Sequence, residues 1–380
     1  MRLPLALSPC VKAQPDIVVV ERGSVLVYRM FDVAEAIDLA ALEEHARTAI
    51  GSSRLRIARP RGQALIIKNA PVSIALGEQD VLIGHAIHRC GLQARVWDYG
   101  VISLQFRVPV SAIEWSALID LGAAIENAAT FDSVARERLD ALLTIIGPAV
   151  QTRHDWPGTE DHVIYFLEEL SGIEQVSELP ERVDVAALML GEATHALSEK
   201  TRRVIAQNAY QYWAHDLAVL DWNSALVVEP SGVMDVPDVI EFALTHLIEL
   251  RYYDDLLDDK LGDLYDAIER SERKLFRTNY ARLSREASAL FMDITEFIER
   301  VENSLKVIGD FYLATIFRAA VGRLRLHEWE ENVTRKLDLL ARVSELLSAQ
   351  ATAHQGHVLE WIVILLIAFE IVWALVGLGH

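Results

Sequence analysis

The N-terminal quarter of the chain alternates short apolar runs with turn residues. The runs are rich in β-branched residues and occupy residues 16–20, 24–30, 54–58, 64–69, 72–76 and 96–108. Such runs are typical of strands, and we predict a sheet here. The segment 34–50 is rich in helix formers, and two more helices are expected at 112–129 and 133–146. An α+β domain over residues 1–150 follows from this order.

The polar loop at 151–162 separates this part from a second α+β segment, which we place at 151–235. This segment contains a strand-like run from Val163 and two short helical patterns. Near its end, Asp221-Trp222-Asn223-Ser224 separates two apolar runs between 217 and 230. That arrangement predicts a β-hairpin.

From Val236 the pattern changes to long helices. Apolar residues recur every seven positions, as in a coiled coil. One row contains Leu283, Leu290 and Phe297, and the partner row contains Ala287, Ile294, Val301 and Ile308. We predict an antiparallel helical hairpin over 236–357 with a turn near Gly322, and the alternative is one continuous coiled coil. We predict that Leu283, Leu290, Phe297, Val301 and Ile308 form an oligomer seam, and whether it packs within or between chains stays open.

The last residues, 358–380, form an almost continuous apolar run that contains Trp361, Glu370 and Trp373. About 19 helical residues cover the roughly 30 Å core of a bilayer. The apolar side chains contribute about −4 to −7 kcal/mol to insertion, which exceeds the roughly 2.5 to 3.5 kcal/mol that Glu370 costs. We therefore predict a C-terminal transmembrane helix. The alternatives are a buried core helix and a hydrophobic oligomerisation tail.

Charge and cysteine content narrow the function classes. The net charge is −19 with a pI near 5.1, which argues against direct binding to nucleic acid. Cys10 and Cys90 are too few for a disulfide framework. The N-terminus lacks a secretory signal, so the expected location is a bacterial inner membrane, crossed once, with the body in the cytoplasm.

The sequence contains none of the common phosphate-binding, serine-hydrolase or zinc-protease motifs. The best candidate for a site is the acidic helix around 251–266. There, Asp254 with Asp258 and Asp255 with Asp259 are spaced to present adjacent carboxylates to a metal ion. The alternative is a solvated acidic face. The loop residues His154, Asp155, Asp161 and His162 are a weaker metal candidate, and no cofactor is predicted.

The tail from Lys336 to Val376, with HVLEWIVILLIAFEI as its most specific part, resembles the C-terminal region of the Rmd-type (required for meiotic nuclear division) family. The run WDYGVISLQF at 97–106 is similar to that family's N-terminal strand motif. The resemblance implies homo-oligomers at an inner membrane that support translation by holding ribosomes nearby. It assigns no catalytic residues.

These patterns together predict an α+β protein: an N-terminal mixed α/β body, a long coiled-coil-like helical hairpin and one C-terminal transmembrane helix. We expect a non-enzymatic, membrane-anchored scaffold or assembly factor that forms homo-oligomers and holds a protein partner near the membrane. The resemblance implies that this partner is ribosome-associated. The alternative is a membrane-tethered metal-dependent enzyme that uses the carboxylates of Asp254 to Asp259.

Overall fold

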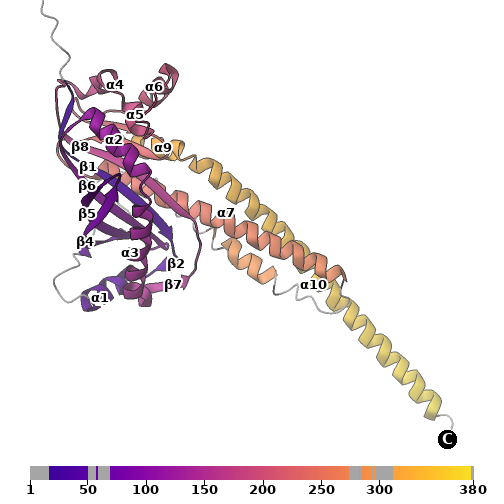
Figure 1. The fold of residues 1–380 in the computed structure, drawn as a ribbon. Coiled ribbons are helices and arrows are strands. Elements are labelled where there is room, and N and C mark those ends of the chain that lie inside the picture. Colours follow the sequence, from indigo (N-terminus) through magenta and orange to yellow (C-terminus); the bar gives the residue numbers. More distant parts are fainter. Residues whose placement is uncertain are drawn as a thin grey trace, which may run out of the picture. The chain divides into compact units, whose positions relative to one another are not determined.

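The computed structural model describes residues 17–49, 57–58, 69–273, 282, 284–292, 294–295 and 311–377 (Figure 1). The chain divides into two compact units. Unit 1 contains residues 1–248 and 307–325, and unit 2 contains residues 249–306 and 326–380. The fold is mixed α/β, with a large sheet and several helices. The predicted class, an α+β body that ends in a transmembrane helix, is therefore wrong.

The described strands of unit 1 form a nine-stranded sheet in the order β3-β4-β5-β6-β1-β8-β11-β10-β9. Neighbours are antiparallel except β8 and β11, which are parallel. The longest strands lie at its centre, because each is hydrogen-bonded along both edges. The strands are β1 (Val19–Asp32), β3 (Ile57–Ala58), β4 (Val72–Ile83), β5 (Ala86–Val96), β6 (Val101–Glu114), β8 (Thr159–Ser171), β9 (Ala209–Tyr210), β10 (Leu217–Leu220) and β11 (Ser224–Val228).

A separate pair of short strands, β2 (Ala34–Ile37) and β7 (Val150–Arg153), lies outside this sheet. Several helices pack on one face of the large sheet around an apolar core that includes Val27, Phe106 and Phe131. They are α2 (Trp115–Glu126), α3 (Thr130–Ile146), α5 (Val185–Met189) and α6 (Glu199–Ala206). Two further helices of this unit are α1 (Leu39–Ala49) and α4 (Leu179–Arg182).

The opposite face of the sheet is covered by the first part of α7 (Asp235–Arg273) and by α9 (Phe311–Arg323). Phe242 of α7 stacks on Trp97 and lies 5.8 Å from the ring centre of Phe317 of α9. Side chains on a strand alternate between faces, so Tyr28 points to α7 while Val27 enters the apolar core. Unit 1 thus has three layers.

Unit 2 is helical. It contains the rest of α7, the helical residues 284–292 and α10 (Leu326–Gly377), one helix of 52 residues. Its buried apolar side chains include Leu257, Leu261, Leu264, Ala287, Ile294, Val333, Leu337, Leu340 and Val343. The hydroxyls of Ser284 and Ser344 lie 3.1 Å apart, so the segment 284–292 packs beside α10.

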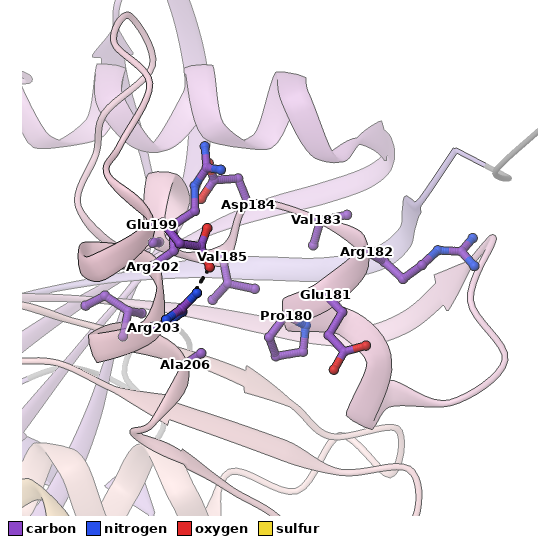
Figure 2. Close-up of a pocket in the computed structure, with 12 residues that line it drawn as sticks. Pro180, Glu181, Arg182, Val183, Asp184, Val185, Glu199, Arg202, Arg203 and Ala206 are labelled. Atoms are coloured by element: carbon purple, nitrogen blue, oxygen red, sulfur yellow. Dashed lines mark hydrogen bonds and ion pairs between the residues drawn. The ribbon is translucent and has the colours of Figure 1, made fainter.

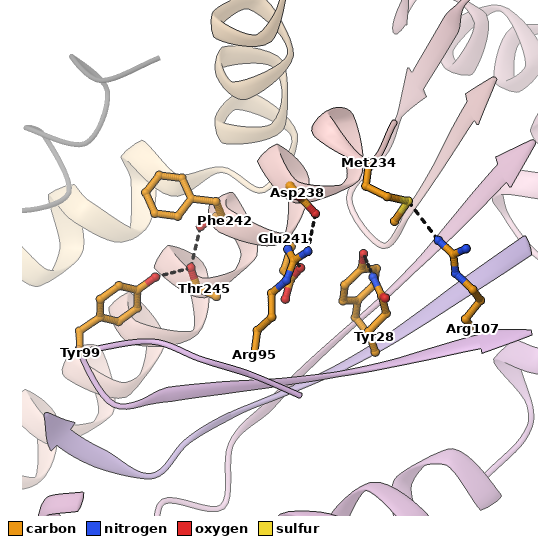
Figure 3. A network of polar contacts seen from close by, with 10 residues as sticks. Tyr28, Arg95, Tyr99, Arg107, Met234, Asp238, Glu241, Phe242 and Thr245 are labelled. Atoms are coloured by element: carbon orange, nitrogen blue, oxygen red, sulfur yellow. Dashed lines mark hydrogen bonds and ion pairs between the residues drawn. The ribbon is translucent and has the colours of Figure 1, made fainter. Parts of the chain in front are cut away.

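Several predicted elements are confirmed. The helices predicted at 112–129 and 133–146 correspond to α2 and α3, and the hairpin predicted at 217–230 is formed by β10 and β11. The segment 34–50 differs, because its first residues form β2 before α1 begins. Strand β5 was not expected, since polar residues such as Arg95 interrupt its apolar pattern. In the folded protein Arg95 faces α7 (Figure 3).

The structure corrects the prediction of a C-terminal membrane anchor. Among the described residues, no helix combines the length and the apolar character that a membrane crossing requires. The apolar run with Trp361, Glu370 and Trp373 is the final part of α10, which begins as a strongly charged amphipathic helix. The prediction of a transmembrane, tail-anchored protein in a bacterial inner membrane is therefore wrong.

Candidate functional site

A buried ionic network joins the sheet to α7 (Figure 3). Arg95 of β5 donates to the carboxylate of Glu241 at 2.6 Å and forms an ion pair with that of Asp238 at 2.7 Å. The side chain of Glu241 is 1% exposed. Burial raises the pKa of Glu241, and the guanidinium of Arg95 opposes that rise. Both carboxylates need this one cation, because an unpaired buried charge is strongly destabilising.

Neutral hydrogen bonds extend this network along the helix. The hydroxyls of Tyr99 and Thr245 lie 2.7 Å apart, and the amide of Gln105 donates to the hydroxyl of Tyr28. Burial raises the pKa of Tyr28 well above its ordinary value, so this hydroxyl stays protonated. The guanidinium of Arg95 is the shared partner of both carboxylates. This arrangement suits a clamp that holds α7 on the sheet better than a reactive centre.

Two of the four carboxylates that were predicted to bind a metal form ion pairs with a lysine. The Nζ atom of Lys336 on α10 lies 2.7 Å from a carboxylate oxygen of Asp254 and 2.7 Å from one of Asp258. Asp255 and Asp259 are exposed. Within the described part of the chain, no group of three or more acidic, histidine or cysteine side chains is arranged to hold a metal ion. A metal at Asp254, Asp255, Asp258 and Asp259 stays a prediction.

The residues of the loop at 151–162 are separated by the fold. His154 lies 3.1 Å from the carboxylate of Asp32, which is buried at the end of β1. His162 belongs to β8, and burial lowers its pKa to about 3. Asp161 is exposed. These side chains therefore have different surroundings and do not form one site.

The predicted oligomer seam is described in part. Leu283, Phe297, Val301 and Ile308 lie outside the described residues. Leu290 is half-buried, and two residues of the partner row, Ala287 and Ile294, are buried within a single chain. The described part of this seam therefore packs inside unit 2.

The C-terminal part of α10 has a different character. Eight large apolar side chains between Val363 and Trp373 are each 51% to 72% exposed: Val363, Ile364, Leu365, Leu366, Ile367, Phe369, Ile371 and Trp373. Five of them are consecutive, so they point to every side of the helix. Glu370 is exposed among them, and the side chain of Trp361 lies outside the described residues. We call residues 363–373 the apolar end of α10.

A pocket of about 420 Å³ lies between α4, α5 and α6 (Figure 2). Its lining combines apolar side chains with charged ones of both signs. The lining residues are Pro180, Glu181, Arg182, Val183, Asp184, Val185, Ala186, Glu199, Arg202, Arg203, Ile205 and Ala206. No motif marked this pocket, because its residues come from three short helices and meet only in the fold.

In a comparison with known protein families, residues 22–235 match the family described as "Uncharacterized protein MJ0711, N-terminal domain". The relative "Uncharacterized protein MJ0711" from Methanocaldococcus jannaschii is 21% identical over 217 residues, which are 57% of this chain and 66% of the relative. No solved structure matches the chain. The match contains the pocket and the sheet except for the first residues of β1, and it ends where α7 begins.

These matches give no indication of an Rmd-type family, and that resemblance is wrong. It rested mainly on the tail from Lys336 to Val376, which lies outside the residues that the family match covers.

Proposed function

This chain belongs to the family of the MJ0711 N-terminal domain, and we propose that it is a non-enzymatic scaffold that self-associates through the apolar end of α10. The observation that carries the proposal is the exposure of eight large apolar side chains between Val363 and Trp373. Exposed apolar patches of this kind mark interaction surfaces.

A second copy of the chain is the occupant that we propose for this segment. A helix that is apolar on all sides is stable only when all sides are covered. Identical chains supply identical apolar ends, and a bundle of them covers each helix from several directions. One partner helix covers only one face, so we expect an assembly of three or more chains.

The scaffold proposal also draws on the charged groups of the protein. Arg95 is matched by Glu241 and Asp238, and Lys336 by Asp254 and Asp258. Paired charges of this kind hold elements together. The expectation of a ribosome-associated partner depended on the Rmd-type resemblance, so the proposal names no partner beyond other copies of the chain.

The test compares two leucines on the same helix. Leu366 is 61% exposed within the apolar end of α10, and Leu346 is 63% exposed outside it. We expect Leu366→Glu to lower the mass of the assembly in light scattering, since a charge in the bundle is costly. Leu346→Glu should leave that mass unchanged, and circular dichroism should show equal helix content in both variants. A wild-type chain that is monomeric, or equal masses for both variants, would overturn the proposal.

A further inference from the structure

The pocket between α4, α5 and α6 has an apolar floor. Val185, Ala186 and Ile205 line it and are 4%, 3% and 4% exposed. Pro180 and Val183 add partly exposed apolar surface on the α4 side (Figure 2). A volume of about 420 Å³ falls within the range of small-molecule sites, roughly 300 to 1,000 Å³. The floor therefore suits an aliphatic group.

The walls of the pocket are held by contacts that need no ligand. The carboxylate of Asp184 accepts from the backbone N–H of Ala187 at 3.0 Å and pairs with Arg202 at 2.8 Å. Ser198 caps α6 by accepting from the N–H of Thr201. These contacts fix α5 against α6, so the pocket is formed before anything binds.

The rim carries charges of both signs in equal number. Three arginines, Arg182, Arg202 and Arg203, line the pocket with three acids, Glu181, Asp184 and Glu199. Arg203 pairs with Glu199 at 3.1 Å, and their side chains are 73% and 66% exposed. An exposed pair one helical turn apart is weak, so a ligand can exchange with it at little cost.

The equal number of positive and negative side chains restricts the class of ligand that the pocket can bind. A phosphate or nucleotide requires a net positive site, and the three acids cancel the three arginines. A purely apolar molecule leaves the charged rim without a role. A zwitterion with an aliphatic side chain matches the whole lining, because its carboxylate pairs with Arg203, its ammonium with Glu199 or Glu181, and its side chain with the floor.

We infer that this pocket binds a free aliphatic amino acid. The site lies in unit 1, within the family-matched residues, and it is independent of the apolar end of α10 in unit 2. Binding at the pocket and self-association can therefore succeed or fail separately.

Titration calorimetry on the full chain tests this inference with four probes. Leucine carries all three recognised groups, whereas 4-methylpentanoate lacks the ammonium, 3-methylbutylamine lacks the carboxylate and glycine lacks the side chain. We expect leucine to bind, with the other three at least about tenfold weaker, since each loses one contact of the set. Valine, isoleucine and methionine serve as further aliphatic probes.

Two variants on α6 link the signal to the pocket. Arg203→Gln should weaken leucine binding about tenfold or more, because a charge-assisted hydrogen bond is lost. Lys200→Gln is the matched control, since Lys200 is an exposed cation of the same helix that does not line the pocket. The inference is overturned if none of the four aliphatic amino acids binds, if 4-methylpentanoate binds as well as leucine, or if Arg203→Gln and Lys200→Gln behave alike.

Discussion

Arg95 and Glu241 lie 146 positions apart in the sequence, and the guanidinium of one donates to the carboxylate of the other at 2.6 Å. This contact joins β5 to α7 across the face of the sheet opposite the main apolar core. The Arg95 side chain near the end of β5 is therefore part of the protein interior.

We expect Arg95→Met to lower the free energy of unfolding by about 3 to 5 kcal/mol, because Glu241 and Asp238 lose their cation while buried. Urea denaturation measures this loss. The control is Arg89→Met, which removes the exposed pair of Arg89 with Glu78 and should cost less than about 1 kcal/mol. Similar losses in the two variants would show that the network does not stabilise the protein.

The buried histidine of β8 predicts a sensitivity to acid. Burial lowers the pKa of His162 from 6.5 to about 3, so below pH 6.5 the unfolded chain binds a proton that the folded chain does not accept. The free energy of unfolding should therefore fall as the pH falls from 6.5 towards 3.

The variant His162→Leu removes this titration and should make the free energy of unfolding less dependent on pH across the same window. Denaturation curves at several pH values measure the slope. His195→Leu, which changes a histidine with an 85% exposed side chain, should keep the wild-type slope. If His162→Leu keeps it as well, His162 does not cause the acid sensitivity.

Alanine substitutions at two glycines with positive φ distinguish the cost of backbone strain from the cost of a steric clash. A Cβ at Gly100 (φ 97°) would lie 1.6 Å from the carbonyl oxygen of Ala34, whereas one at Gly77 (φ 86°) meets nothing within 4 Å. Gly77→Ala should cost about 1 to 2 kcal/mol of stability from strain alone. Gly100→Ala should cost more than about 4 kcal/mol, because the backbone must also move. Thermal denaturation of both variants measures the difference, and equal costs would contradict the turn geometry.

Lys336 is expected to stabilise unit 2 through Asp254 and Asp258. We expect Lys336→Met to lower the opening free energy of α10 by about 1 to 3 kcal/mol, since two carboxylates lose their partner. Hydrogen exchange of the α10 amides measures this loss. Lys260→Met, at an exposed lysine of α7, is the control. A rise in the melting temperature of the wild type with Mg²⁺ would favour the metal hypothesis over the lysine pairing.

Local patterns were sufficient for several elements. The hairpin of β10 and β11 follows from two apolar runs around Asp221 to Asn223, because turn residues and alternation act over a few positions. Helices α2 and α3 follow in the same way from residue composition and from the break at Gly147-Pro148. In the heptad rows, Ala287 and Ile294 are buried, as core positions should be.

Other features depended on contacts between distant residues. Lys336 pairs with carboxylates 82 and 78 positions away, and no spacing rule connects them. The pocket lining is spread over residues 180–206 and becomes a cavity only when α4, α5 and α6 pack together. The same limit explains why β5 was missed, since the partners of Arg95 come much later in the chain.

The sequence by itself determined where apolar and polar residues recur, and this periodicity specifies helices, strands and turns because their geometry repeats over two to seven positions. It also showed the apolar end of α10, but not what covers it. Only the tertiary structure decided which charges meet, that Arg95 of β5 lies in the interior and where a pocket lies. These properties depend on distances between residues that are far apart along the chain, and only folding sets those distances.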